Sequence, residues 1–277
     1  MNTSPLKNSI TNQTALEQVV WPESQDFNSN NIVAFQTTRI APTDVSSCSS
    51  SPYNAFNLGL HVKDNPFIVE KNRDALLSFL PSFSSIQWLN QVHGNEVAEV
   101  SKVNKSPITA DAVITREKKL ALAVMTADCL PILLSDEQGE VIAAIHGGWR
   151  PLAVDIIKRT LQKMQTPSNK VFAWLGPCIG PNHFEVGEEV KNIFCQNNAK
   201  FETAFNLIKH KPPIKAQNKP ARKYLADLQK VATIQLNALG VKHIHALQEC
   251  SYELNDKYYS YRKSSVTGRM ASIICIK

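Results

Sequence analysis

The sequence predicts an α/β fold with a mixed sheet at the centre of a single domain. Three near-continuous apolar runs, at 120–126, 130–134 and 141–145, have the composition of strands buried on both faces. Strand and helix patterns alternate along the chain, but without the regular strand–helix–strand order of a fully parallel sheet. No GxGxxG or Walker sequence is present, which argues against a nucleotide-binding fold of the Rossmann or P-loop kind.

The length and composition indicate one large globular unit. Of the 277 residues, 43% are hydrophobic and 19% charged, enough for one sizeable core. Residues 1–31 are rich in Asn, Ser, Thr and Gln and predict a mostly flexible polar tail that becomes ordered near the apolar patch at 19–21. We therefore expect a single catalytic domain at 32–277. No apolar run has transmembrane length and no signal-peptide pattern occurs, so we expect a cytoplasmic protein without membrane contact.

The first half of the chain predicts one helix among several strands. A strand is expected at 32–36. A helix is expected from about Phe67 to Phe79, with Asn65 or Asp64 as its N-cap. Extended segments at 86–89, 97–103 and 109–114 lead into the central apolar runs.

The second half predicts further helices between short strands. A helix follows the HGGWR motif, and Pro151 suits its first position. Val154, Ile157 and Leu161 recur at helical spacing and predict one buried face. Further strands are expected at 171–174, 243–247, 258–262 and 271–276, and helices from Glu185 to about Cys195 and over 225–239, where Gly240 ends the second.

Polar residues interrupt the apolar framework at the ends of predicted strands. His93, His146 and the pair Asp128-Cys129 each lie at such an end, near glycine or proline. Two imidazoles and one thiolate suit a tetrahedral zinc ion, and three protein ligands leave a fourth position for water or substrate. We expect Asp128 to orient a ligand histidine or to take a proton.

Two other hypotheses use these residues differently. Cys129 and a histidine can form a nucleophile pair, with the backbone amides of the HGGW turn as an oxyanion hole. A cysteine can also serve packing alone. His243 and His245 alternate on a predicted strand and could bind copper together, but seven histidines are too few for a multicopper centre.

The charge pattern and the cysteine spacing indicate neither a nucleic-acid-binding surface nor a disulfide framework. The net charge of +6 is modest, and the lysines between Lys209 and Lys223 lack interleaved aromatic residues. We interpret that basic cluster as a solvated linker and expect no nucleic-acid partner. The six cysteines are scattered without a CxxC pair, so we expect reduced thiols rather than a disulfide framework.

Motifs along most of the chain resemble those of the YfiH-like family, also called the laccase-domain or multicopper polyphenol oxidase family. In order they are TTR (37–39), NLG (57–59), NQVHG (90–94), ADA around Asp111, MTADCLP (125–131), HGGWR (146–150), WLGPCIGP (174–181), FEVG (184–187), SYR (260–262) and TGRMAS (267–272). The resemblance implies an α/β/β/α sandwich with zinc held by His93, Cys129 and His146. The chain departs from the family's common glycines at 41–42, Lys63 and Pro151.

The resemblance also implies an enzyme that acts on purine nucleosides. The implied reactions are phosphorolysis of adenosine, inosine and methylthioadenosine, and deamination of adenosine. His93, Asp128, Cys129 and His146 would form the catalytic set, and Arg39, Asn57, Arg150 and Arg269 would bind substrate, because arginine suits phosphate or carboxylate. We expect zinc, with copper as the alternative metal, and a monomer or weak homodimer.

Three other functions stay open from the sequence. A related bacterial role in the family is a cytoplasmic amidase that edits peptidoglycan precursors. The chain can also be a non-catalytic binding protein that zinc stabilises. Copper-dependent polyphenol oxidation fits least well, because of the small number of histidines.

Overall fold

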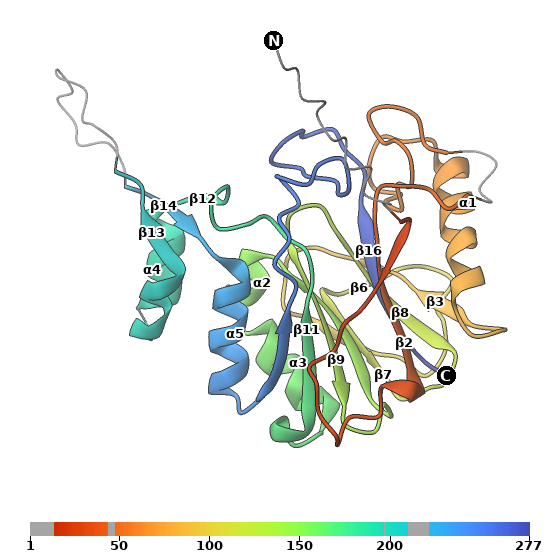
Figure 1. Cartoon of the computed structure of the whole chain (residues 1–277), viewed down its shortest axis with the longest axis horizontal. Helices are drawn as coiled ribbons and strands as arrows, with labels where there is room; N and C mark the ends of the chain where they lie inside the picture. Colours follow the sequence, from red (N-terminus) through yellow and green to blue (C-terminus); the bar gives the residue numbers. More distant parts are fainter. Residues whose placement is uncertain (1–13, 44–47, 197, 210–221) are drawn as a thin grey trace, which may run out of the picture.

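Two mixed sheets stacked face to face form the centre of the molecule (Figure 1). The computed structural model describes residues 14–43, 48–196, 198–209 and 222–277. The five-stranded sheet has the order β1 (Leu16–Gln18), β2 (Ile32–Thr37), β16 (Met270–Ile276), β8 (Leu120–Thr126), β3 (Ser85–Gln87). The six-stranded sheet has the order β15 (His243–Ala246), β11 (Val171–Leu175), β9 (Leu130–Asp136), β10 (Ile142–Gly147), β7 (Ala112–Thr115), β5 (Val97–Glu99).

Parallel strand pairs occur at the edges of both sheets. β3 runs parallel to β8, β15 to β11, and β5 to β7, whereas the remaining pairs in these sheets are antiparallel. Two smaller sheets lie outside them: β12 (Glu185–Gly187) and β13 (Phe205–Leu207) flank β14 (Lys223–Ala226), and β4 (Leu89–Asn90) pairs with β6 (Ile108–Thr109).

Helices cover the outer face of each central sheet (Figure 1). On the five-stranded sheet lies α1 (Pro66–Leu76), continued by the 3₁₀ turn Leu77–Phe79. On the six-stranded sheet lie α2 (Trp149–Ala153), α3 (Ile156–Met164) and α5 (Leu228–Ala238), whereas α4 (Glu188–Cys195) packs beside α5 against β12 and β14 of the small sheet (Figure 1). The described residues contain three further 3₁₀ turns, at Ser29–Asn31, Ser168–Lys170 and Ala199–Ala204.

Alternation along the central strands explains why their sequences are apolar throughout. In β8, Leu122 and Val124 point into the core between the sheets, whereas Ala121 and Ala123 point to the α1 side. β8, β9 and β10 are buried along their whole length, as strands covered on both faces must be. The α/β/β/α sandwich predicted from the sequence is confirmed.

Several predicted elements begin or end differently. The helix after the HGGWR motif is two helices, because Asp155 between α2 and α3 has a left-handed backbone (φ 64°). Val154 consequently lies 46% exposed rather than on the buried face of Ile157 and Leu161, and Pro151 is the third residue of α2, not the first.

Two further predictions near the C-terminal half need correction. α5 begins at Leu228, since the Asp227 side chain caps it by accepting from the amide of Lys230, and Leu225 belongs to β14. Residues 258–262 form a bend, an irregular stretch and a turn instead of a strand. Most of the basic cluster, residues 210–221, lies outside the described residues. No helix in the described part of the chain is both long and apolar enough to cross a bilayer.

The described part of the segment predicted as a tail packs on the domain. β1 pairs with β2, Val19 is 5% exposed, and Phe27 stacks on Phe172 with ring centroids 4.3 Å apart. Trp21 also packs against the inter-sheet core. These apolar side chains bring residues 14–31 into the folded unit, which therefore begins before residue 32.

We expect Phe27→Ala to lower the free energy of unfolding by about 2 kcal/mol, less than loss of a fully buried phenylalanine, because the ring is half-buried against Phe172. Phe83→Ala is the matched control: this ring is 96% exposed, so its loss should change stability by no more than about 0.5 kcal/mol. Urea unfolding followed by circular dichroism measures both. Equal losses in the two variants would contradict the packing of this segment.

Candidate metal centre and active-site pocket

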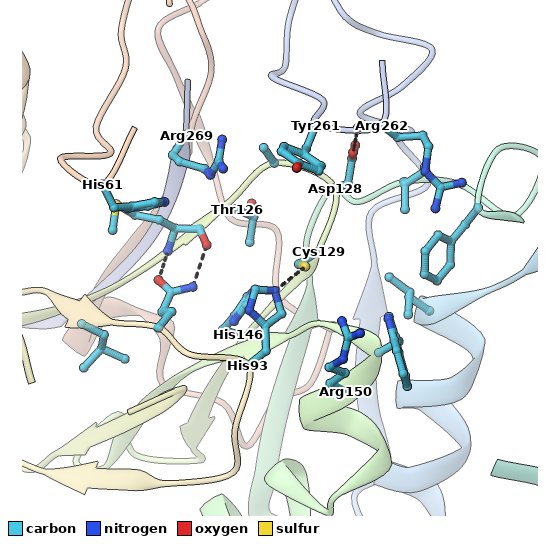
Figure 2. A pocket seen from close by; sticks show the side chains of 18 of the residues that line it. His61, His93, Thr126, Asp128, Cys129, His146, Arg150, Tyr261, Arg262 and Arg269 are labelled. Carbon is cyan, nitrogen blue, oxygen red and sulfur yellow. Dashed lines mark hydrogen bonds between the residues drawn. The ribbon is translucent and has the colours of Figure 1, made fainter. Parts of the chain in front are cut away.

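The connection between the two sheets carries the candidate site. β8 lies in one sheet and β9 in the other, so residues 127–129 cross from sheet to sheet at one end of the sandwich. His146 near the end of β10 pairs with Pro131 of β9, and His93 follows β4. The fold thereby gathers His93, Cys129 and His146 from three separate strand ends (Figure 2).

The donor atoms of these three side chains form a compact cluster. They all lie within 4.8 Å of one another, with His93 Nε2 at 3.8 Å from Cys129 Sγ. The two imidazole rings meet edge to face, 4.6 Å between centroids. Two nitrogens and one sulfur with an open side toward a pocket match the donor set of a zinc site that keeps a free position.

A buried carboxylate positions both histidines. Asp111 is fully buried, and its oxygens accept hydrogen bonds from the backbone amides of Val92, His93 and Gly94 at 2.6–3.2 Å. Its Oδ1 also lies 2.8 Å from His146 Nδ1. With Nδ1 engaged by Asp111, the Nε2 atom of His146 is the one available as a ligand, as in carboxylate–histidine–metal triads.

This turn requires an uncommon backbone that the carboxylate stabilises. His93 has φ 59°, in the left-handed region that non-glycine residues rarely adopt. Three amides that converge on one carboxylate compensate for that conformation. The position of His93 therefore depends on Asp111 as much as on β4.

The electrostatics of the cluster favour a thiolate. Burial alone would raise the pKa of Cys129, but the adjacent His146 and His93 together lower that pKa to about 6. Burial alone would lower the pKa of His146, but Cys129 and Asp111 outweigh burial and raise that pKa to about 9. Burial alone would raise the pKa of Asp111, but hydrogen bonds from His146 and from the amides of Gly94 and Val92 lower it below its usual value. Cys129 is thus held in the ionised form that ligates metals or attacks electrophiles.

A pocket of about 660 Å³ opens over the cluster, a size typical of small-molecule sites. Besides the three clustered side chains, its lining includes the aromatic residues Trp149, Phe184 and Tyr261. Arg150, Arg262 and Arg269 surround the cluster (Figure 2). His61 also lines the pocket, and burial together with Arg269 and Arg73 lowers its pKa to about 4.

Asp128 has a different place from the one expected. Its Oδ1 accepts from Ser251 Oγ at 2.7 Å and its Oδ2 from the amide of Arg262 at 2.6 Å. Its carboxylate thus ties together the loops that form the pocket wall. The carboxylate that orients a histidine of the cluster is instead that of Asp111.

Of the four predicted substrate-binding residues, two line the pocket. Arg150 and Arg269 do so, whereas the Arg39 guanidinium is hydrogen-bonded outside it to the carbonyls of Asn54 and Asn255. Asn57 is fully buried, and its Oδ1 accepts from the amides of Gly59 and Arg269. Asn57 therefore acts on the pocket through the backbone of Arg269.

Several residues of the site were not predicted from the sequence. Gln91 exchanges two hydrogen bonds with the backbone of Met125, and this fixes the pocket floor. Thr126 is 2% exposed, and its hydroxyl has no hydrogen-bond partner among the described residues. Arg262 and Tyr261 come from the turns that were predicted to be a strand. Asp111 was visible only as part of the ADA motif before a buried strand.

Comparison with known proteins agrees with the motifs. A family model described as multi-copper polyphenol oxidoreductase laccase matches residues 34–277. The chain belongs to this family. Purine nucleoside phosphorylase YfiH of Escherichia coli is 39% identical over 241 residues, which cover 84% of this chain and 94% of that protein. A purine nucleoside phosphorylase of Pseudomonas aeruginosa is 38% identical over 245 residues, covering 86% and 96%.

Solved structures have the same fold. A Neisseria meningitidis protein superposes with a TM-score of 0.82 and 34% identity, covering 95% of this chain and 100% of its own. YlmD from Geobacillus stearothermophilus superposes with a TM-score of 0.75 and 26% identity, covering 93% and 96%. The two stacked sheets with their covering helices are therefore a property of the family.

We expect Asp111→Asn to weaken zinc binding by about tenfold to hundredfold and to lower the free energy of unfolding by about 2 kcal/mol, because an amide nitrogen would face backbone N–H donors. Asp136→Asn is the matched control. Asp136 Oδ1 also accepts from two amides, of Glu140 and Val141, but at the far end of β9. Titration with a chromophoric chelator should show wild-type zinc affinity in Asp136→Asn. An equal loss in both variants would mean that Asp111 has no special role at the cluster.

Proposed function

We propose that the protein is a zinc-dependent purine nucleoside enzyme that phosphorolyses adenosine, inosine and methylthioadenosine and also deaminates adenosine. The observation that carries the proposal is one pocket that combines a His₂Cys cluster with three guanidinium groups and aromatic walls. The names of the relatives at 38–39% identity support the phosphorolytic half. The donor set of His93, Cys129 and His146 supports the zinc.

Phosphorolysis requires the pocket to hold an anion against a sugar. A phosphate oxygen forms a bond to the anomeric carbon while the bond from that carbon to the purine nitrogen breaks. The base leaves with the electron pair and takes up a proton. Positive groups around the pocket suit the incoming phosphate, and of these Arg150 is the most available.

The availability of Arg150 follows from the contacts of the other two arginines. Arg269 donates to the carbonyls of Thr267 and Gly268, and Arg262 donates to those of His183 and Glu185. The Arg150 guanidinium stacks over Trp149 at 4.4 Å and has no hydrogen bond to another described residue. Its donors are therefore free for a phosphate, whereas those of Arg262 and Arg269 are partly committed.

Deamination requires a water molecule at the purine ring. The water oxygen bonds to the ring carbon that carries the amino group, and ammonia leaves. Zinc held by His93, Cys129 and His146 would supply a Lewis acid that brings the pKa of such a water toward 7. The chain's own residues orient the ring: the buried Thr126 hydroxyl offers an unsatisfied hydrogen-bonding group at the pocket wall, and Tyr261 and Phe184 offer aromatic faces.

Polyphenol oxidation by several coppers has little support in the pocket. Of the histidines in the described residues, only His61, His93 and His146 line it, and a multicopper centre needs more imidazole ligands. The experiment on nucleosides distinguishes the proposed function from the peptidoglycan amidase and the non-catalytic binding protein, neither of which releases a base from inosine.

The test is release of hypoxanthine from inosine by zinc-loaded protein, with and without phosphate. We expect phosphate-dependent release that falls by about a thousandfold or more in Cys129→Ala, as when a central catalytic group is lost. Cys195→Ser is the matched control: it removes another half-buried thiol beside Glu202, outside the pocket, and should retain full activity. Zinc-loaded wild type that releases no base would refute the proposal and favour the amidase or the binding protein.

Arg150→Met should raise the KM for phosphate by about tenfold, because one charge-assisted contact is worth about 1.5 kcal/mol. Arg39→Met is the control, since this guanidinium binds carbonyls outside the pocket; it should leave the KM for phosphate unchanged and lower thermal stability. Steady-state kinetics at varied phosphate distinguish the two. The assignment of Arg150 fails if the KM for phosphate changes in Arg39→Met but not in Arg150→Met.

A further inference from the structure

A second group of potential metal ligands lies behind the pocket wall. His183, Cys250 and Glu253 place one imidazole nitrogen, one sulfur and one carboxylate oxygen within 4.8 Å of one another. Two loops distant in sequence supply them, the WLGPCIGP–FEVG segment and the segment after β15. None of the three residues lines the pocket described above.

The thiol of Cys250 and the imidazole of His183 are each held in place by a specific contact. Cys250 Sγ accepts a hydrogen bond from the amide of Gly180 at 3.1 Å. Glycine suits position 180, because a Cβ there would lie 3.1 Å from the same sulfur. The His183 ring stacks on Tyr252, with centroids 4.4 Å apart and planes 19° from parallel. These contacts fix the positions of the thiol and the imidazole.

The chemistry of the three groups suits a borderline divalent metal. Nitrogen, sulfur and carboxylate oxygen are the three ligand types that zinc takes in proteins. Cys250 and Glu253 in their ionised forms balance the charge of a divalent ion.

An ion can reach the cluster with small movements. The side chains of His183 and Glu253 are 30% and 53% exposed, and His183 Nε2 and Glu253 Oε1 share a hydrogen bond of 2.8 Å that an ion would replace. Zinc–ligand bonds of about 2.0–2.3 Å place ligand atoms roughly 3.5 Å apart around a tetrahedral ion. Rotation of the exposed Glu253 side chain can separate the two atoms to that distance.

We propose that His183, Cys250 and Glu253 form a second zinc-binding site, with water at the fourth position. The proposal does not depend on the nucleoside activity. An ion there would join the two loops that shape the pocket wall. Ser251, next to Cys250, donates to Asp128, Phe184, next to His183, lines the pocket, and the His183 carbonyl accepts from Arg262.

The test counts zinc bound per chain after removal of loosely bound metal, measured by plasma mass spectrometry on the full-length protein. We expect two equivalents in wild type and one equivalent in His183→Ala, in Cys250→Ser and in Cys129→Ala. Cys195→Ser is the matched control, a half-buried cysteine beside a carboxylate and a lysine but without a histidine, and should retain two. Glu253→Gln, an exposed and conservative change, should also bind one and shows the effect without a risk to folding.

Cobalt gives an independent readout of the sulfur ligand. In Cys129→Ala loaded with Co²⁺, we expect a near-ultraviolet thiolate-to-cobalt absorption that disappears on the further change Cys250→Ser. The proposal is overturned if wild type binds a single zinc that Cys129→Ala removes. It is equally overturned if a second zinc persists in His183→Ala, Cys250→Ser and Glu253→Gln.

Discussion

The carboxylate of Asp111 is the contact on which the candidate metal centre depends. It is fully buried, yet it accepts three backbone amides of the His93 turn and faces His146 Nδ1 at 2.8 Å. A buried charge without partners would be very costly, and here every partner belongs to a residue of the cluster or to its turn. One side chain thus couples the stability of this end of the sandwich to the geometry of two ligands.

The same end of the molecule shows why a two-sheet sandwich suits such a site. β8 and β9 belong to different sheets, so the three residues between them must cross the gap where the inter-sheet core ends. Apolar packing on both faces fixes the strands rigidly. Cys129 and Asp128 therefore project from a short connection with little freedom, and a loop network around Asp128 and Ser251 closes the pocket on the side away from the sheets.

The pattern of apolar residues and capping residues predicted the central strands and the start of α1, but not the features that depend on tertiary contacts or on an unusual backbone. The apolar runs identified β8, β9 and β10, and Asn65 caps α1 as expected, by accepting from the amide of Phe67. The break at Asp155 depends on a left-handed backbone that no periodicity reveals. Residues 258–262 have strand composition, but Tyr258 and Tyr259 are fully buried by tertiary packing. The sequence predicted His93, Cys129 and His146 together because each lies near a predicted strand end, and the structure brings them close to one another. Asp111 resembles an ordinary buried polar residue until its partners are known.

The geometry also bears on the two hypotheses for Cys129 that the sequence left open. A cysteine–histidine nucleophile pair needs one imidazole beside the thiolate and an orienting group behind it, and His146 with Asp111 provides both. Such a nucleophile pair does not require a second imidazole. His93 nevertheless approaches Cys129 Sγ to 3.8 Å, in a left-handed turn that three hydrogen bonds to Asp111 stabilise. The three hydrogen bonds thus stabilise an uncommon backbone conformation that brings a second imidazole nitrogen to the sulfur. A three-ligand metal site requires this arrangement, which therefore favours ligation over nucleophilic attack.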